Sequence, residues 1–118
     1  MDCLVIALRP QWCDLILSGS KTIELRRQCP RRLDKGMRVL LYSQGHIHGE
    51  AVLCGWDRCG TGEDIARRHW RGSQLLQDEA TAYLAGARCP GALYLTNAHR
   101  YPQPQQWHGS VPQNFLYA

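Results

Sequence analysis

The hydrophobic pattern at the start of the chain predicts a strand followed by a helix. Residues 2–8 (DCLVIAL) form a continuous apolar run rich in β-branched side chains, which is typical of a buried strand. Pro10 suits the first turn of a helix, and apolar side chains recur at helical spacing over 10–18. Gly19 then stands where a left-handed helix C-cap is expected.

After Gly19 the apolar period changes to two, which predicts strands. Ile23 and Leu25 lie on one face of the next strand, and its other face is polar. Residues 30–36 read as a basic, turn-rich loop. Three further strands are expected over 37–43, 46–56 and 91–97. The dipeptide Gln44-Gly45 marks the turn between the first two of them.

Residues 61–85 are expected to hold two short helices. Thr61 and Asp64 resemble a capping box, and Ser73 is a candidate N-cap for the second helix. The Pro- and Gln-rich stretch 102–113 reads as a tail. Several strands, an early helix and late inserted helices favour an α+β class, with a small mixed or antiparallel barrel. The expected site is a cleft that the early helix leaves uncovered on the sheet.

The length and composition fit one soluble domain over residues 1–118. Apolar residues make up 44% and charged residues 20%, which argues against disorder. No apolar run approaches the roughly 20 residues of a membrane span, and the first residues lack the pattern of a secretory signal. We therefore expect a cytoplasmic protein without a membrane partner. Its six scattered cysteines are expected to be thiols.

The basic charge is concentrated in one segment. The chain carries +4 overall, but seven bases and two acids lie between Lys21 and Arg38, so the remaining residues sum to −1. Arginine forks fit phosphate oxygens, and a patch of this kind indicates an anionic partner such as nucleic acid. A merely solvated surface explains the charge equally well.

The most specific stretch is Gly19–Arg26 (GSKTIELR), at the junction of the first helix and the second strand. It resembles the ASCH family, whose signature is G-x-K-x-x-E-x-R directly after a helix. Flanking segments, from Leu8-Arg9-Pro10 to Pro112-Gln113, extend the resemblance over nearly the whole chain. The resemblance implies a PUA-like β-barrel whose cleft is lined by the signature residues and binds RNA or nucleotides.

The chemistry of the signature residues agrees with a binding cleft. Glu24 and Arg26 are two apart on one strand face, so both side chains point the same way. The carboxylate is suited to a base edge and the guanidinium to a phosphate. Lys21 has the opposite parity, but its long stem starts at a turn and reaches the same cleft. The alternative is that Glu24 and Arg26 form an ion pair that only closes the barrel.

Weaker candidates surround this core. Further residues expected to contact nucleic acid are Arg9, Arg27, Arg31, Arg32, Tyr42 and Ser43. His46 and His48 alternate on one strand, yet nothing completes a metal site at a compelling spacing, so we expect none. Gly60-Thr61-Gly62 stands ahead of a helix like a phosphate-binding turn. It lacks a P-loop lysine, which favours a flexible turn.

An enzyme of the same fold is the alternative to a binding module. One small branch of the family resembles an amidohydrolase that acts on N4-acetylcytidine and pairs the signature lysine with a threonine three positions later. Here that position is Glu24. Other members resemble ribonucleases, for which a divalent metal is possible. Lys21 and Glu24 are the catalytic residues if this chain is a hydrolase. We favour binding of single-stranded RNA or a nucleotide, with no cofactor and no obligatory protein partner.

The basic segment predicts salt-sensitive RNA binding. Because neutralised phosphates release counterions, RNA affinity should fall steeply as salt rises. Replacing Arg31 and Arg32 by Ala should flatten that dependence, measured by fluorescence anisotropy over a range of salt concentrations. An unchanged slope would show that neither arginine contacts a phosphate.

Overall fold

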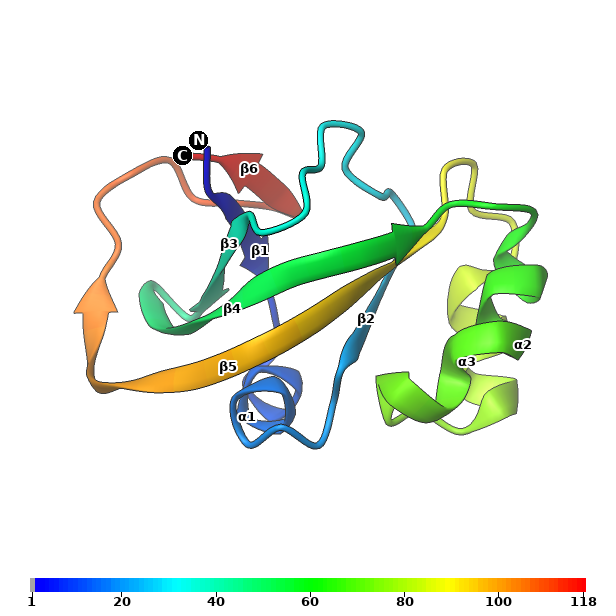
Figure 1. Cartoon of the computed structure of the whole chain (residues 1–118), viewed down its shortest axis with the longest axis horizontal. Coiled ribbons are helices and arrows are strands. Elements are labelled where there is room, and N and C mark those ends of the chain that lie inside the picture. The colour runs from blue at the N-terminus through cyan, green and yellow to red at the C-terminus, as the bar shows by residue number, and fades with distance from the viewer. Residues whose placement is uncertain (1) are drawn as a thin grey trace.

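A computed structural model describes residues 2–118, which fold as one α+β domain (Figure 1). The elements in chain order are β1 (Leu4–Ala7), α1 (Pro10–Leu17), β2 (Ile23–Arg26), β3 (Arg38–Ser43), β4 (His46–Asp57), α2 (Gly62–Ser73), α3 (Gln77–Leu84), β5 (Gly91–Gln106) and β6 (Phe115–Tyr117). No helix within the described residues is both long and apolar enough to cross a membrane.

The six strands form one mixed sheet in the order β2-β5-β4-β3-β1-β6, curved into a half-barrel. Strands β1 and β3 are parallel, and every other neighbouring pair is antiparallel. Because β6 pairs with β1, the two ends of the chain lie together (Figure 1). The expected class, an α+β barrel-like sheet with an early helix and inserted helices, is confirmed.

Two apolar clusters hold the helices to the sheet. Helix α1 begins at Pro10 and buries Cys13 and Ile16 in the main core, formed with β1, β3, β4 and β5. Gly49 on β4 lies against both β5 and α1, since a Cβ there would clash with the backbone carbonyl oxygen of His99 and lie 2.5 Å from Cδ2 of Leu17. The second cluster packs α2 and α3 against β2 and β5. The two helical units, α1 on one side and α2 with α3 on the other, therefore leave space between them at β2.

Two expectations about chain boundaries are wrong. Ser73 is the last residue of α2 and not an N-cap, because α3 begins after Leu76. The expected tail is partly strand, since β5 continues to Gln106. On the β4 side, bulges in the strand pairing accommodate Pro102 and Pro104. On the other side, β2 pairs only with the start of β5, so no neighbouring strand needs the N–H groups that these prolines lack. The capping box of Thr61 and Asp64 is confirmed.

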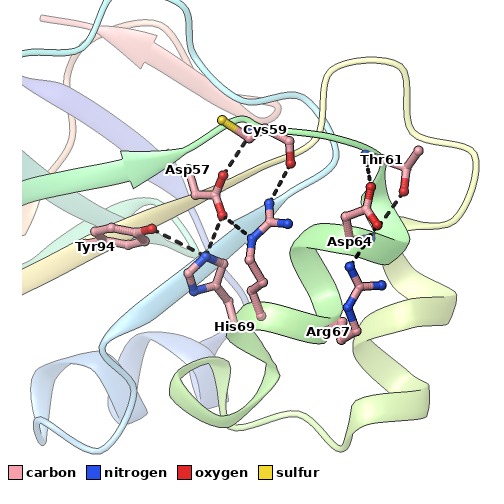
Figure 2. Close-up of polar contacts among 8 residues, drawn as sticks. Asp57, Cys59, Thr61, Asp64, Arg67, His69 and Tyr94 are labelled. Atoms are coloured by element: carbon pink, nitrogen blue, oxygen red, sulfur yellow. Dashed lines mark hydrogen bonds and ion pairs between the residues drawn. The ribbon is translucent and has the colours of Figure 1, made fainter.

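Asp57, the last residue of β4, ties the sheet to α2 (Figure 2). Its Oδ2 accepts hydrogen bonds from Arg68 Nε at 2.9 Å and His69 Nε2 at 2.7 Å, and its Oδ1 accepts one from Cys59 N–H. Burial on its own would raise the pKa of Asp57. The hydrogen bonds from Arg68, Cys59 and His69 outweigh it and lower the pKa from 3.8 to about 2.

This lowered pKa predicts an acid-sensitive contact. The ionised Asp57 stabilises the fold above about pH 4, and the contribution is lost as the pH falls from about 4 to about 2. Asp57→Asn should lower the free energy of unfolding at pH 7 by about 1–2 kcal/mol. Between about pH 4 and about pH 2, this variant should lose less stability than wild type. Urea denaturation at several pH values measures both. Asp14→Asn, which breaks an exposed ion pair with Arg100, is the control; parallel pH profiles for wild type and Asp57→Asn would contradict the assignment.

Candidate binding cleft

A cleft of about 500 Å³ opens where the two helical units leave β2 uncovered. Trp12 borders it from α1 and Arg9 from the N-cap position of that helix, and Tyr83 borders it from α3. The residues at its floor come from β2 and from the turn before it. Asn114, just before β6, completes the wall. Four separate segments of the chain therefore build this site.

The signature residues meet at the floor of the cleft as a buried charged triad. Lys21, Glu24 and Arg26 are 4%, 5% and 6% exposed. Glu24 bridges the other two: its Oε1 lies 3.4 Å from Lys21 Nζ and its Oε2 lies 2.8 Å from Arg26 Nη1. A buried charge without a partner is costly, so this pairing is what makes the burial of all three tolerable. The triad carries one net positive charge.

Arg26 also joins the two edges of the half-barrel. Its Nη1 donates to the carbonyl of Ala7 at 3.3 Å, and its Nη2 donates to the carbonyl of Asn114 at 2.7 Å and to the Asn114 side-chain oxygen. With the bond to Glu24, all four terminal N–H groups are engaged. Only the Nε–H is left for a ligand. The ion pair between Glu24 and Arg26 that closes the barrel, one of the two expectations from the sequence, is thus present in the structure.

Lys21 keeps capacity for a ligand. Its Nζ donates to the carbonyl of Ser73 at 2.7 Å and faces Glu24, which leaves one of its three N–H groups. The same Nζ lies 5.4 Å from the ring centroid of Trp12. Burial lowers the pKa of Lys21 below its usual 10.5, and the charge of Glu24 only partly opposes this effect. A lysine of this kind serves as a cation for phosphate or as a proton donor and acceptor.

The remaining candidates are distributed over several places. Arg9 lies at the rim of the cleft. Arg27 donates to the carbonyls of Tyr83 and Ala85, at 2.5 and 3.0 Å, and thereby straps β2 to the end of α3. Arg32 pairs with Asp2 at 3.1 Å and stacks on Tyr117, away from the cleft. Arg31 lines a second cavity. The basic segment is thus not one continuous surface.

Tyr42 and Ser43 do not border the cleft. Ser43 points into the core of β3, where its hydroxyl is buried and has no hydrogen-bond partner among the described residues. Conversely, sequence reasoning missed Glu79, Tyr83 and Asn114 as cleft residues. Nothing in the local pattern of α3 marks its two residues as functional. Asn114 directly follows Pro112-Gln113, which the resemblance did single out.

The donor set of the cleft does not fit a divalent metal. Its buried carboxylate, Glu24, is already shared by Lys21 and Arg26, and the other acid is Glu79 on α3. Hard cations need several oxygen ligands. Within residues 2–118, no group of three His, Cys, Asp or Glu side chains is placed to hold an ion. Glu50 on β4 lies outside the cleft, where it pairs with Arg38 at 2.8 Å and accepts a hydrogen bond from the Tyr101 hydroxyl.

No family model and no curated protein matches the chain. Solved structures do match it. The crystal structure of an ASCH protein from Zymomonas mobilis has a TM-score of 0.84 and 23% sequence identity, covering 98% of this chain and 86% of its own. Two variants of that protein, a tyrosine-to-phenylalanine and a serine-to-alanine change, match with TM-scores of 0.84 and 0.83, at 22% and 23% identity. Each match covers 98% of this chain, and it covers 88% of the first variant and 87% of the second.

The fold and the cleft therefore define an α+β protein of PUA-like architecture with a buried Lys-Glu-Arg triad. More narrowly, the chain has the fold of the ASCH proteins, as the signature at Gly19–Arg26 indicated.

The triad predicts that this site and the stability of the fold depend on the same residues. Arg26→Gln should lower the free energy of unfolding by about 3 kcal/mol or more, because it breaks a buried ion pair and frees acceptors on Ala7 and Asn114. Arg100→Gln, which removes an arginine from an exposed ion pair, should cost at most about 1 kcal/mol. Urea denaturation compares the two variants. Equal losses would contradict the barrel-closing role of Arg26.

Proposed function

We propose that the cleft binds one nucleotide unit, either of a single-stranded RNA or as a free nucleotide. The observation that carries this proposal is the buried, cross-linked triad at the floor of a concave, open cleft beside two aromatic side chains. A fixed carboxylate and fixed cations together match a ligand that has both hydrogen-bond donors and phosphate oxygens. Trp12 and Tyr83, one on each side of the cleft, offer faces on which a base stacks.

Each charged residue has a distinct role in this proposal. Lys21 gives its remaining N–H to a phosphate or carbonyl oxygen of the ligand. Glu24 is held in place by two cations, but each of its oxygens has a second lone pair, which accepts from the amino group of a base. Arg26 fixes Glu24 and contributes positive potential rather than a forked phosphate contact, because its terminal N–H groups are engaged.

The lowered pKa of Lys21 favours a second candidate function, hydrolysis of RNA or of a modified nucleoside. A lysine that loses its proton more easily than usual, next to a carboxylate in a cleft, has the properties of a general acid–base pair. It would act on a bound water or a ribose hydroxyl. Thr22 is exposed and its N–H bonds to Gly72, outside the cleft, which gives no support to a threonine nucleophile.

The two functions predict different results for the same variants. If the cleft only binds, Lys21→Ala and Glu24→Gln should weaken adenosine monophosphate binding, measured by calorimetry, while wild type leaves RNA and N4-acetylcytidine intact with or without divalent metal. Binding by wild type should also decline as the pH rises through the pKa of Lys21, below 10.5, and Lys21→Arg should keep its affinity there.

If the cleft is catalytic, both variants should lower kcat by about 10² to 10⁴. Trace nucleases mimic such activity, so turnover counts only if it disappears in a Lys21 variant purified identically. Because Lys21 is buried, Lys21→Met is included as a neutral variant of similar length, and denaturation confirms that each variant is folded. Turnover equal in wild type and the Lys21 variants would contradict a catalytic Lys21, and unchanged nucleotide affinity would contradict the binding site.

A further inference from the structure

A second cavity, of about 450 Å³, lies at the other end of β2. Three loops meet there: the chain leaving β2, the turn after β4 and the chain entering β5, which converge at one end of the sheet in Figure 1. A bridge between Gln28 and Cys89, and the hydrogen bond from Cys29 N–H to the Cys89 carbonyl, hold two of these loops together. The third is joined by Arg58.

This cavity is lined by three arginines, one from each loop, and by no acidic residue. They are Arg31, Arg58 and Arg88. Arg58 is fixed in place: its Nη1 donates to the carbonyls of Pro30 and Arg31 at 3.1 and 2.9 Å, and its guanidinium lies 5.8 Å from the ring centroid of Trp56. Within residues 2–118, the guanidiniums of Arg31 and Arg88 have no hydrogen-bond or ion-pair partner. Three guanidiniums around one cavity, with no acid among its lining residues, are suited to an oxyanion.

The charge of this cavity contrasts with that of the cleft. The cleft is lined by three bases and two acids, so most of its positive charge is already neutralised. The second cavity has three bases and no acids. A ligand that carries both a base and phosphates therefore finds its hydrogen-bonding and stacking groups in the cleft, and its strongest positive potential in the second cavity.

The two cavities lie along one path. Residues 24–26 line the cleft and Arg31 lines the second cavity, while on the other side Tyr83 lines the cleft and Arg88 the second cavity. Arg27 straps these two segments to each other between the cavities. Five residue-to-residue steps separate Arg26 from Arg31 and span at most about 17 Å. This is the length of about five stacked nucleotides at about 3.4 Å each.

We propose that Arg31, Arg58 and Arg88 form a second phosphate-binding site, which holds the backbone of an RNA strand whose base occupies the cleft. This inference rests on the proposed function and narrows it, because it makes an oligonucleotide the preferred ligand over a free nucleotide. Arg32 has no part in it, since that arginine is paired elsewhere.

The test compares ligand length with arginine variants. Wild type should bind a hexanucleotide RNA more tightly than adenosine monophosphate. Arg31→Gln and Arg88→Gln should weaken hexanucleotide binding several-fold at low salt, reduce the slope of log affinity against log salt by up to about 0.7, and leave mononucleotide binding unchanged. Arg100→Gln is the matched control, because it removes an equal charge from the distant part of β5.

Cysteine alkylation gives a readout at the site itself. Cys89 is exposed and lines the second cavity, while Cys54 is exposed on β4 and does not. Bound hexanucleotide should slow the reaction of Cys89 with iodoacetamide and leave Cys54 unaffected, as measured by peptide mass spectrometry. Inorganic phosphate is tested alongside it. If phosphate protects Cys89 and the hexanucleotide does not, the cavity takes a small free anion and the RNA path is overturned.

The two proposals fail in distinguishable ways. If Arg31→Gln and Arg88→Gln match Arg100→Gln while Lys21→Ala still weakens nucleotide binding, the second site is wrong and the cleft stands. If Arg88→Gln weakens hexanucleotide binding but Lys21→Ala has no effect, the cleft is wrong and the second site stands as a phosphate site. Absence of both binding and Cys89 protection in wild type overturns both.

Discussion

The bridge from Glu24 through Arg26 to Ala7 and Asn114 is the contact on which the rest of this structure depends. The sheet is an open half-barrel, with β2 at one edge and β6 at the other. A single guanidinium on β2 reaches the end of β1 and the chain just before β6, and so joins these edges without a strand between them. Such a group must be buried, which requires a buried carboxylate beside it. The cleft floor is a consequence of closing the barrel.

This arrangement separates the residues that hold the fold from those left for a ligand. Arg26 uses its terminal N–H groups on the protein, whereas Lys21 keeps one N–H group and Glu24 keeps lone pairs at the cleft floor. The aromatic faces come from helices on either side, which belong to different apolar clusters. Small changes in the packing of α3 would therefore change the width of the cleft without breaking the triad.

The likeness to the Zymomonas mobilis ASCH structures concerns the fold, at 22–23% identity. The charge of this chain is distributed unevenly over that fold. The basic segment that looked continuous in the sequence divides into a strap at Arg27, an exposed ion pair at Arg32 and a cavity at Arg31. Only the last of these leaves its charge available to a partner. Net charge alone therefore overstates the binding surface.

The sequence by itself determined the local features. The period of two after Gly19 placed Glu24 and Arg26 on one face, the capping box placed the start of α2, and the apolar runs placed most strands, because each depends on residues a few positions apart. The tertiary structure decided the rest. It extended β5 by pairing it with β4, and it placed the start of α3 at Gln77, after the N-cap Leu76. It also brought together Arg31, Arg58 and Arg88, and gave Arg26 acceptors on β1 and before β6. Contacts between distant segments depend on how the sheet curves and how the helices pack, which no local pattern records.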